Sequence, residues 1–142
     1  ILLGLGMLTS NYASAGHDTC SLKSLVGKWV FATDVGHQML GGPFPPDKDI
    51  TAIGTIVIDR FGGLTSNFDV TIQDFMFFPG NTSVGSIVVN RDCTGTLTFI
   101  SSAGTARTDS IVILGPREFL GMSQDPLNLW TYQARKVSRR NN

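Results

Sequence analysis

One histidine has a spacing that would suit acid–base chemistry. His37 follows Asp34 by three residues, in a stretch rich in glycine and proline. If the two side chains meet, the Asp34 carboxylate can orient the imidazole to act as a general base. The alternative is a solvated loop histidine, because one His–Asp spacing of this kind is common by chance.

Arg107 and Asp109 form a second pair, two residues apart in a run of β-forming residues. Side chains with this spacing share one face of a strand. Facing into an apolar barrel, the pair would anchor a ligand carboxylate or carbonyl. Facing outward, it would be an ordinary surface ion pair of little energetic value. Ile111 and Ile113 on the same face favour the inside, but Arg107 lies near the end of the run, so both orientations stay open.

Three aromatic residues are further candidates for ligand contact. Trp130 and Tyr132 share one face of the last predicted strand, and Trp29 lies in the first. Large aromatic side chains more often line a core or a cavity wall than perform catalysis. We therefore expect these three residues in the wall of the interior.

The chain carries no motif for a cofactor or a common catalytic centre. Patterns for a serine nucleophile elbow, a zinc HExxH site, a phosphate-binding loop, a dinucleotide-binding loop and a calcium-binding loop are missing. Two histidines are too few for a His-rich metal site. The sequence predicts no cofactor and no metal ion, and leaves open whether the protein is an enzyme.

Composition limits the function classes. The 142 residues include 11 basic and 11 acidic side chains, and 42% are hydrophobic. Zero net charge argues against nucleic-acid binding, and the high apolar fraction argues against disorder. Four of the basic residues lie in the last eight positions, so residues 1–134 carry a net charge of −4.

The N-terminal segment resembles the end of a signal peptide. Ile1 to Leu8 is an apolar run too short to span a bilayer, and Ala13-Ser14-Ala15 fits a cleavage site. We expect residues 1–15 to be a partial signal peptide without its basic start, and 16–142 to be one secreted or periplasmic domain. The alternative is a retained segment that packs as a strand or contacts another chain.

Export would explain the two cysteines. Cys20 and Cys93 lie 73 residues apart, and neither belongs to a CxxC pair of the zinc or thioredoxin kind. In an oxidising compartment they are expected to form a disulfide that ties the N-terminal segment to the barrel. Two buried free thiols are the alternative.

The rest of the chain has the pattern of an all-β protein. Eight runs rich in β-branched and aromatic residues are separated by short links with turn residues, and no run keeps a helical period. The predicted strands are 27–34, 52–59, 64–72, 84–90, 93–101, 106–114, 118–124 and 129–137. This series predicts an eight-stranded antiparallel up-and-down barrel, because closure removes exposed sheet edges. One short helix is expected within residues 20–26.

Two longer links are predicted as loops at the barrel mouths. Residues 35–49 contain three prolines and three glycines. Residues 73–83 carry an apolar cluster that includes Phe75, Phe77 and Phe78. Such a cluster either plugs the barrel, forms a ligand portal or contacts another subunit.

Some predicted strands are apolar on both faces. Residues 56–58 and 111–114 show no polar alternation. This pattern suggests that part of the outer wall is covered by a loop, the N-terminal segment or another copy of the chain. A homo-oligomer is therefore expected.

Two segments resemble a known group of proteins. Gly27-Lys28-Trp29 is similar to the start of lipocalin-type barrels, where the tryptophan packs across the closed end. The run GSIVVNRDCTGTLTF, residues 85–99, resembles a hairpin of small exported bacterial barrels of calycin or allene-oxide-cyclase-like type. The resemblance implies an eight-stranded barrel with a small apolar cavity, and cyclase activity only in some relatives. No catalytic residue is carried over from them.

Three functions follow as hypotheses. The first is an exported barrel that binds a small apolar or amphipathic molecule in an interior cavity of several hundred cubic ångströms. The second is an allene-oxide-cyclase-like isomerase acting on a flexible apolar substrate, which needs shape and one polar anchor. The third is a structural or assembly subunit that uses the N-terminal segment or the aromatic cluster.

Overall fold

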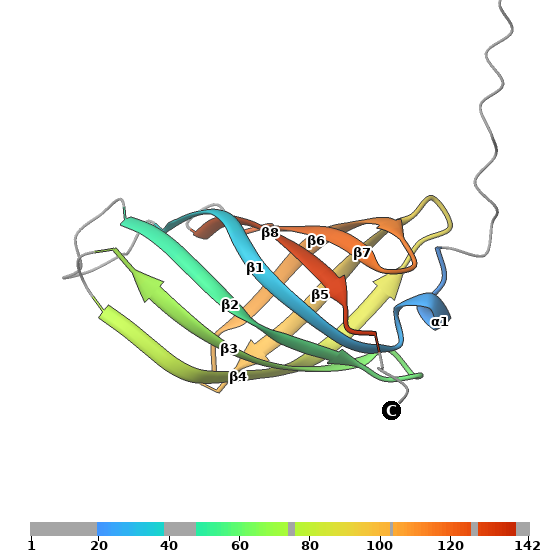
Figure 1. Ribbon diagram of the computed structural model, residues 1–142, viewed down its shortest axis with the longest axis horizontal. Coiled ribbons are helices and arrows are strands. Elements are labelled where there is room, and N and C mark those ends of the chain that lie inside the picture. The colour runs from blue at the N-terminus through green and yellow to red at the C-terminus, as the bar shows by residue number, and fades with distance from the viewer. Residues whose placement is uncertain (1–19, 39–47, 74–75, 103, 126–127, 139–142) are drawn as a thin grey trace, which may run out of the picture.

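The computed structural model describes residues 20–38, 48–73, 76–102, 104–125 and 128–138 (Figure 1). The predicted signal peptide (1–15), Phe75 and most of the predicted 35–49 loop lie outside the described residues. Among the described residues, no helix is long and apolar enough to cross a membrane.

The chain forms a closed barrel of eight antiparallel strands in sequence order, as predicted. The last strand pairs with the first from Trp29 and Lys136 to Gln38 and Asn128, which closes the sheet. The elements are α1 (Leu22–Leu25), β1 (Gly27–Gln38), β2 (Lys48–Ile58), β3 (Gly63–Ile72), β4 (Met76–Val89), β5 (Thr94–Ser101), β6 (Ala106–Gly115), β7 (Glu118–Ser123) and β8 (Asn128–Lys136).

Strand β4 corrects one of the predicted loops. Most of the segment 73–83 belongs to β4, in which Phe77 and Phe78 pair with Thr71 and Val70 of β3. The prediction of a loop was wrong because the strand absorbs its Pro-Gly pair in a bulge. The register shifts between Phe68 and Val70, and Gly80 takes a positive φ there. Similarly, β1 extends to Gln38 and β2 begins at Lys48, so part of the predicted 35–49 loop is strand.

The end of the barrel beside α1 is closed by an apolar plug. Leu25 of α1 and Trp29 of β1 are fully buried, and the Trp29 ring lies 4.9 Å from that of Phe119. The Trp29 Nε1 donates a hydrogen bond of 2.7 Å to the Leu25 carbonyl oxygen. Lys136 Nζ donates to the Ser24 carbonyl oxygen at 2.7 Å, which ties the end of β8 to α1. We call this the closed end, and the opposite end the open end.

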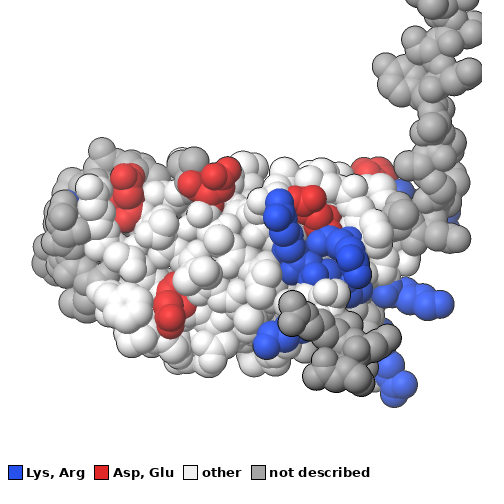
Figure 2. All heavy atoms as spheres, in the orientation of Figure 1, with Lys and Arg blue, Asp and Glu red and all other residues white. Residues whose placement is uncertain are grey.

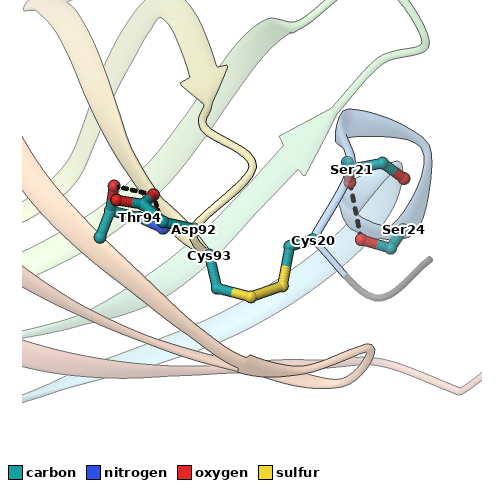
Figure 3. The surroundings of a disulfide bond; sticks show 6 residues. All are labelled: Cys20, Ser21, Ser24, Asp92, Cys93 and Thr94. Atoms are coloured by element: carbon teal, nitrogen blue, oxygen red, sulfur yellow. Dashed lines mark hydrogen bonds between the residues drawn. A yellow bond between two sulfur atoms is a disulfide. The ribbon is translucent and has the colours of Figure 1, made fainter. Parts of the chain in front are cut away.

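The predicted disulfide between Cys20 and Cys93 is present (Figure 3). It joins Cys20, two residues before α1, to the β4–β5 turn, with a Cα–Cα distance of 4.8 Å. Cys93 takes a left-handed φ of 67°, the conformation that Gly62 takes in the β2–β3 turn. Asp92 accepts hydrogen bonds from the backbone and side chain of Thr94, which hold this turn in place and lower the pKa of Asp92.

The outer wall is apolar in several places. Val57, Val112 and Leu114 point outward from the two segments predicted to be apolar on both faces, and all three are exposed. The oligomer expected from this pattern remains a prediction.

Candidate functional site

Arg107 and Asp109 point into the barrel, which decides between the two orientations left open by the sequence. They share the inner face of β6 with Ile111 and Ile113, which are buried. Asp109 is 0% exposed, and Arg107 is 21% exposed in its side chain. The guanidinium contacts both carboxylate oxygens, with Nε 2.9 Å from Oδ1 and Nη2 3.0 Å from Oδ2. This bidentate pair lies in an otherwise mainly aromatic interior.

Aromatic rings from two other strands hold the Arg107 guanidinium, one from the adjacent β5 and one from β8, across the barrel interior. Its central carbon lies 3.8 Å from the centre of the Trp130 ring on β8 and 4.4 Å from that of Phe99 on β5. Cation–π contacts of this kind strengthen when water is excluded. Because Asp109 occupies only part of the five-donor guanidinium, Arg107 retains donors that can reach an acceptor from the open end.

Tyr132 lies next to this pair, at the same level of the barrel. Its side chain is 4% exposed, and its ring packs edge-on to Phe31 at 5.7 Å between centres. The hydroxyl-bearing edge of the ring lies against Gly121 of β7, where any Cβ would overlap it. The absence of a side chain at Gly121 therefore makes room for Tyr132.

Four buried polar atoms in the described part of the site lack a hydrogen bond of normal geometry. Arg107 Nε and Asp109 Oδ1 face each other in the ion pair, and the Tyr132 hydroxyl interacts with Asp109, so Trp130 Nε1 is the donor with no polar partner in the described residues. Leaving a buried polar group unpaired costs roughly 1–3 kcal/mol. Native interiors rarely contain such groups without a reason such as a bound water or ligand.

Burial dominates the electrostatics of this cluster. It raises the pKa of Asp109, an effect that the positive charge of Arg107 opposes. It lowers the pKa of Arg107, and Asp109 again opposes the change. Burial raises the pKa of Tyr132 well above its usual value, and the Asp109 charge and the interaction of the hydroxyl with that carboxylate add to the effect, so the phenol stays neutral and can donate its proton to a hydrogen bond.

The enclosed interior beside these groups is small. It has a volume of about 20 Å³, enough for one water molecule. The expectation of several hundred cubic ångströms is therefore wrong for this conformation, because aromatic side chains fill the barrel. The cavity is lined by Phe31, Thr33, Ile56, Ser66, Phe68, Ser83, Phe99, Arg107, Trp130 and Tyr132.

The lining includes residues that the sequence analysis did not select as site residues. Ser66 and Ser83 face each other across β3 and β4, with 2.5 Å between their hydroxyl oxygens. Phe99 and Phe68 add rings from β5 and β3. Alternation along each strand marks such residues as inward-facing, but only the register of all eight strands shows which of them reach the same level.

Other predicted site residues lie elsewhere. Trp29 belongs to the plug of the closed end and does not line the cavity. Phe77 and Phe78 lie on β4 with exposed side chains, so they are available at the surface. Asp34 is exposed on β1.

The Asp34–His37 pair remains a prediction. His37 belongs to β1 through its backbone, where it pairs with Leu129 of β8. The position of its side chain falls outside what the structure describes.

A wider groove lies on the outer wall over β8, β1, β2 and β3. Its volume is about 800 Å³, and its charged lining residues are Asp34, Asp69 and Arg135. No unpaired buried donor lines this groove in the described residues. The barrel interior, where such donors gather, is therefore the stronger candidate site.

Comparison with known proteins supports the fold alone. No protein-family model and no curated protein matches the chain. A solved de novo designed fluorescence-activating beta barrel is similar, with a TM-score of 0.56 and 14% sequence identity, over 82% of this chain and 96% of that one. The likeness is to an eight-stranded antiparallel barrel in general, a fold that can hold small molecules.

The described residues contain no group of three or more His, Cys, Asp or Glu side chains that could hold a metal ion.

Proposed function

We propose that this protein binds a small amphipathic molecule through an oxygen acceptor, such as a carboxylate or carbonyl, at the Arg107–Trp130–Tyr132 cluster. The observation that carries this proposal is the buried Trp130 Nε1, which has no partner among the described residues, beside the Arg107 cation and the Tyr132 hydroxyl, whose contact with Asp109 lacks normal hydrogen-bond geometry. A bound acceptor would supply the hydrogen bonds that these groups lack.

The chemistry of the cluster favours an acceptor over a donor. Arg107 and Trp130 can only donate, and Tyr132 stays protonated. The closest carboxylate, Asp109, already receives both contacts from Arg107, and Asp125 adds a weaker negative charge nearby. A cationic ligand would therefore meet the Arg107 charge while the Asp109 carboxylate is already engaged, whereas an acceptor oxygen would meet the remaining guanidinium N–H groups, the indole N–H and the phenol.

The small interior volume defines where the rest of the ligand lies. About 20 Å³ accommodates a water-sized polar group but no alkyl chain or ring system. Arg107 is 21% exposed, so its outer edge is reachable. We therefore expect the apolar part of the ligand to lie on the open-end side of Trp130 and Phe99, or to displace one of these rings.

A second candidate is a cyclase or isomerase acting at the same cluster. The specific observation that favours it is the inward position of Asp109 and Tyr132, since a buried carboxyl with a raised pKa is suited to proton transfer. Turnover of a candidate substrate that is lost in Asp109→Asn, with ligand binding retained, would select catalysis over simple binding.

The disulfide supports export as part of this proposal. Structural disulfides persist in oxidising compartments, and Cys20–Cys93 closes the segment next to the predicted leader. We propose a secreted or periplasmic protein, and N-terminal sequencing of the exported form tests the predicted start at Gly16.

Isothermal titration with matched ten-carbon amphiphiles tests the binding function. Decanoate is expected to bind and decyltrimethylammonium is not. Tyr132→Phe and Trp130→Phe should each weaken decanoate binding about tenfold, the value of a hydrogen bond to a charged group. The control Arg135→Gln removes an exposed cation from the outer wall and should bind like the unaltered protein. Equal binding of both amphiphiles, or an Arg135 variant as weak as the others, would refute the proposed anchor.

A further inference from the structure

The charges of the barrel are divided between its two ends. Near the closed end, on α1, the adjoining turns and the strand ends, the described residues include seven basic and three acidic side chains. The other half has two basic residues, Lys48 and the buried Arg107, against five acidic ones. Figure 2 shows Lys and Arg gathered over the half that carries α1. The basic residues of the closed end are Lys23, Lys28, Arg60, Arg91, Arg117, Arg135 and Lys136.

Most of this positive charge is not neutralised within the protein. Arg135 lies 3.7 Å from Glu118. Among the described residues, Arg60, Arg91 and Arg117 have no ion-pair partner, and neither have Lys23 and Lys28. Unpaired cations on one end attract anionic partners over a Debye length, about 8 Å at physiological salt.

An aromatic side chain projects from the same end. Phe61, at the tip of the β2–β3 turn, is 79% exposed, the highest value among the exposed large hydrophobic residues. The Arg60 guanidinium lies 4.6 Å from the centre of its ring. The turn is fixed by Asp59, whose side chain accepts hydrogen bonds from the backbone N–H groups of Phe61 and Gly63. The ring is therefore presented to solvent by a rigid turn and not by a loose end.

A groove with the same character lies on this end. It has a volume of about 680 Å³ and combines the cations Lys28, Arg117 and Lys136 with the exposed apolar side chains of Val57 and Val137. Burial lowers the pKa of Lys136, and the nearby charge of Arg117 adds to this effect. Positive charge beside exposed apolar side chains is the pattern of proteins that lie at a membrane–water interface.

We infer that the closed end of the barrel docks on a membrane surface rich in anionic lipid, with the basic side chains on the headgroups and Phe61 inserted between them. The aromatic tip distinguishes a bilayer from a purely polyanionic partner, because a phenyl ring gains energy only where it leaves water. The sequence is consistent with this orientation, since Arg139-Arg140 follow β8, whose end is tied to α1. The open end with Arg107 would then face away from the membrane.

Vesicle flotation of the proposed mature chain, residues 16–142, tests the docking surface. Phosphatidylcholine vesicles with 30% phosphatidylglycerol should bind the protein more tightly than pure phosphatidylcholine vesicles, and 0.5 M salt should weaken the difference. The ratio between the two kinds of vesicle isolates the contribution of charge.

Single variants locate the surface. Arg60→Gln and Arg117→Gln should each weaken partitioning onto anionic vesicles about fivefold. Phe61→Ser should weaken it about tenfold. Lys48→Gln removes a cation from the open end and should leave partitioning unchanged. Equal binding to both vesicles, or a loss in Lys48→Gln as large as in Arg117→Gln, would overturn the inference; urea midpoints confirm that each variant is folded.

Discussion

Replacing Tyr132 by phenylalanine should make the protein more stable while weakening its binding of ligand. The substitution removes one oxygen and keeps the ring, which packs against Phe31 and Phe119 at 5.7 and 6.4 Å between centres. Removing most buried hydroxyls lowers stability, because a hydrogen bond is lost. Here the hydroxyl interacts with Asp109 but makes no hydrogen bond of normal geometry in the described residues, so the change removes a poorly paired group.

The magnitude follows from the environment of the hydroxyl. An unpaired buried hydroxyl costs about 1–3 kcal/mol, and its proximity to Asp109 recovers part of that cost. We therefore expect Tyr132→Phe to raise the free energy of unfolding by about 1 kcal/mol in the absence of ligand. With saturating decanoate the unaltered protein should become the more stable of the two, because a ligand adds more stability to the protein that binds it more tightly.

Urea unfolding, followed by tryptophan fluorescence, measures this difference. Thr98→Val serves as the control, because it removes a hydroxyl from an exposed position on β5 and should change the free energy by less than about 0.5 kcal/mol. A loss of 1 kcal/mol or more in Tyr132→Phe, together with an unchanged control, would show that the hydroxyl is paired in the native protein. The hydroxyl would then need no hydrogen bond from a ligand, and the argument for a ligand oxygen beside Tyr132 would fail.

Three further predictions concern stability. Reducing the Cys20–Cys93 disulfide, which spans 73 residues, should lower the free energy of unfolding by roughly 4 kcal/mol, measured by urea titration with and without dithiothreitol; a change below 1 kcal/mol would contradict the loop-entropy argument. Burial raises the pKa of the Asp109 carboxyl above its usual value of 3.8, so protonation of this carboxyl favours the folded protein. This stabilisation is complete below pH 3.8 and is lost as the pH rises through the folded-state pKa. The free energy of unfolding of the unaltered protein, measured relative to that of Asp109→Asn, should therefore fall as the pH rises from 3.8 through the folded-state pKa. A rise in this difference would mean that the attraction to Arg107 outweighs the effect of burial on Asp109. Gly121→Ala should lower the thermal midpoint, because the new methyl group overlaps the Tyr132 ring; an unchanged midpoint would show that the ring can move at little cost.

The barrel could be predicted because its signals are local. Alternation and turn residues lie within each strand, and the predicted strands overlap all eight observed ones. The first half of β4 was not predicted, because Pro79 and Gly80 indicate the end of a strand. In the structure these two residues form a bulge opposite Asp69, and the strand continues through it. Gly80 N–H donates to Asp69 Oδ1 at 2.7 Å, a contact between strands that the local pattern does not contain.

The site could be predicted only in part, because its contacts are not local. Arg107 and Asp109 were recognisable as a pair, but their direction depends on packing against Phe99 and Trp130 from other strands. The small interior volume depends on how all the inward rings pack together. The partner of a buried donor such as Tyr132 is likewise a property of the folded interior and not of its neighbours in sequence.

The most direct test of the proposed binding site is the NMR signal of the two tryptophan indole N–H groups. Trp29 Nε1 is hydrogen-bonded to Leu25 in the closed end, whereas Trp130 Nε1 has no partner in the described residues. Titration of ¹⁵N-labelled protein with decanoate should shift the Trp130 signal downfield in a saturable way and leave the Trp29 signal in place. A Trp130 signal that stays fixed while decanoate binds, or a Trp29 signal that moves as far, would contradict an acceptor site at Arg107, Trp130 and Tyr132.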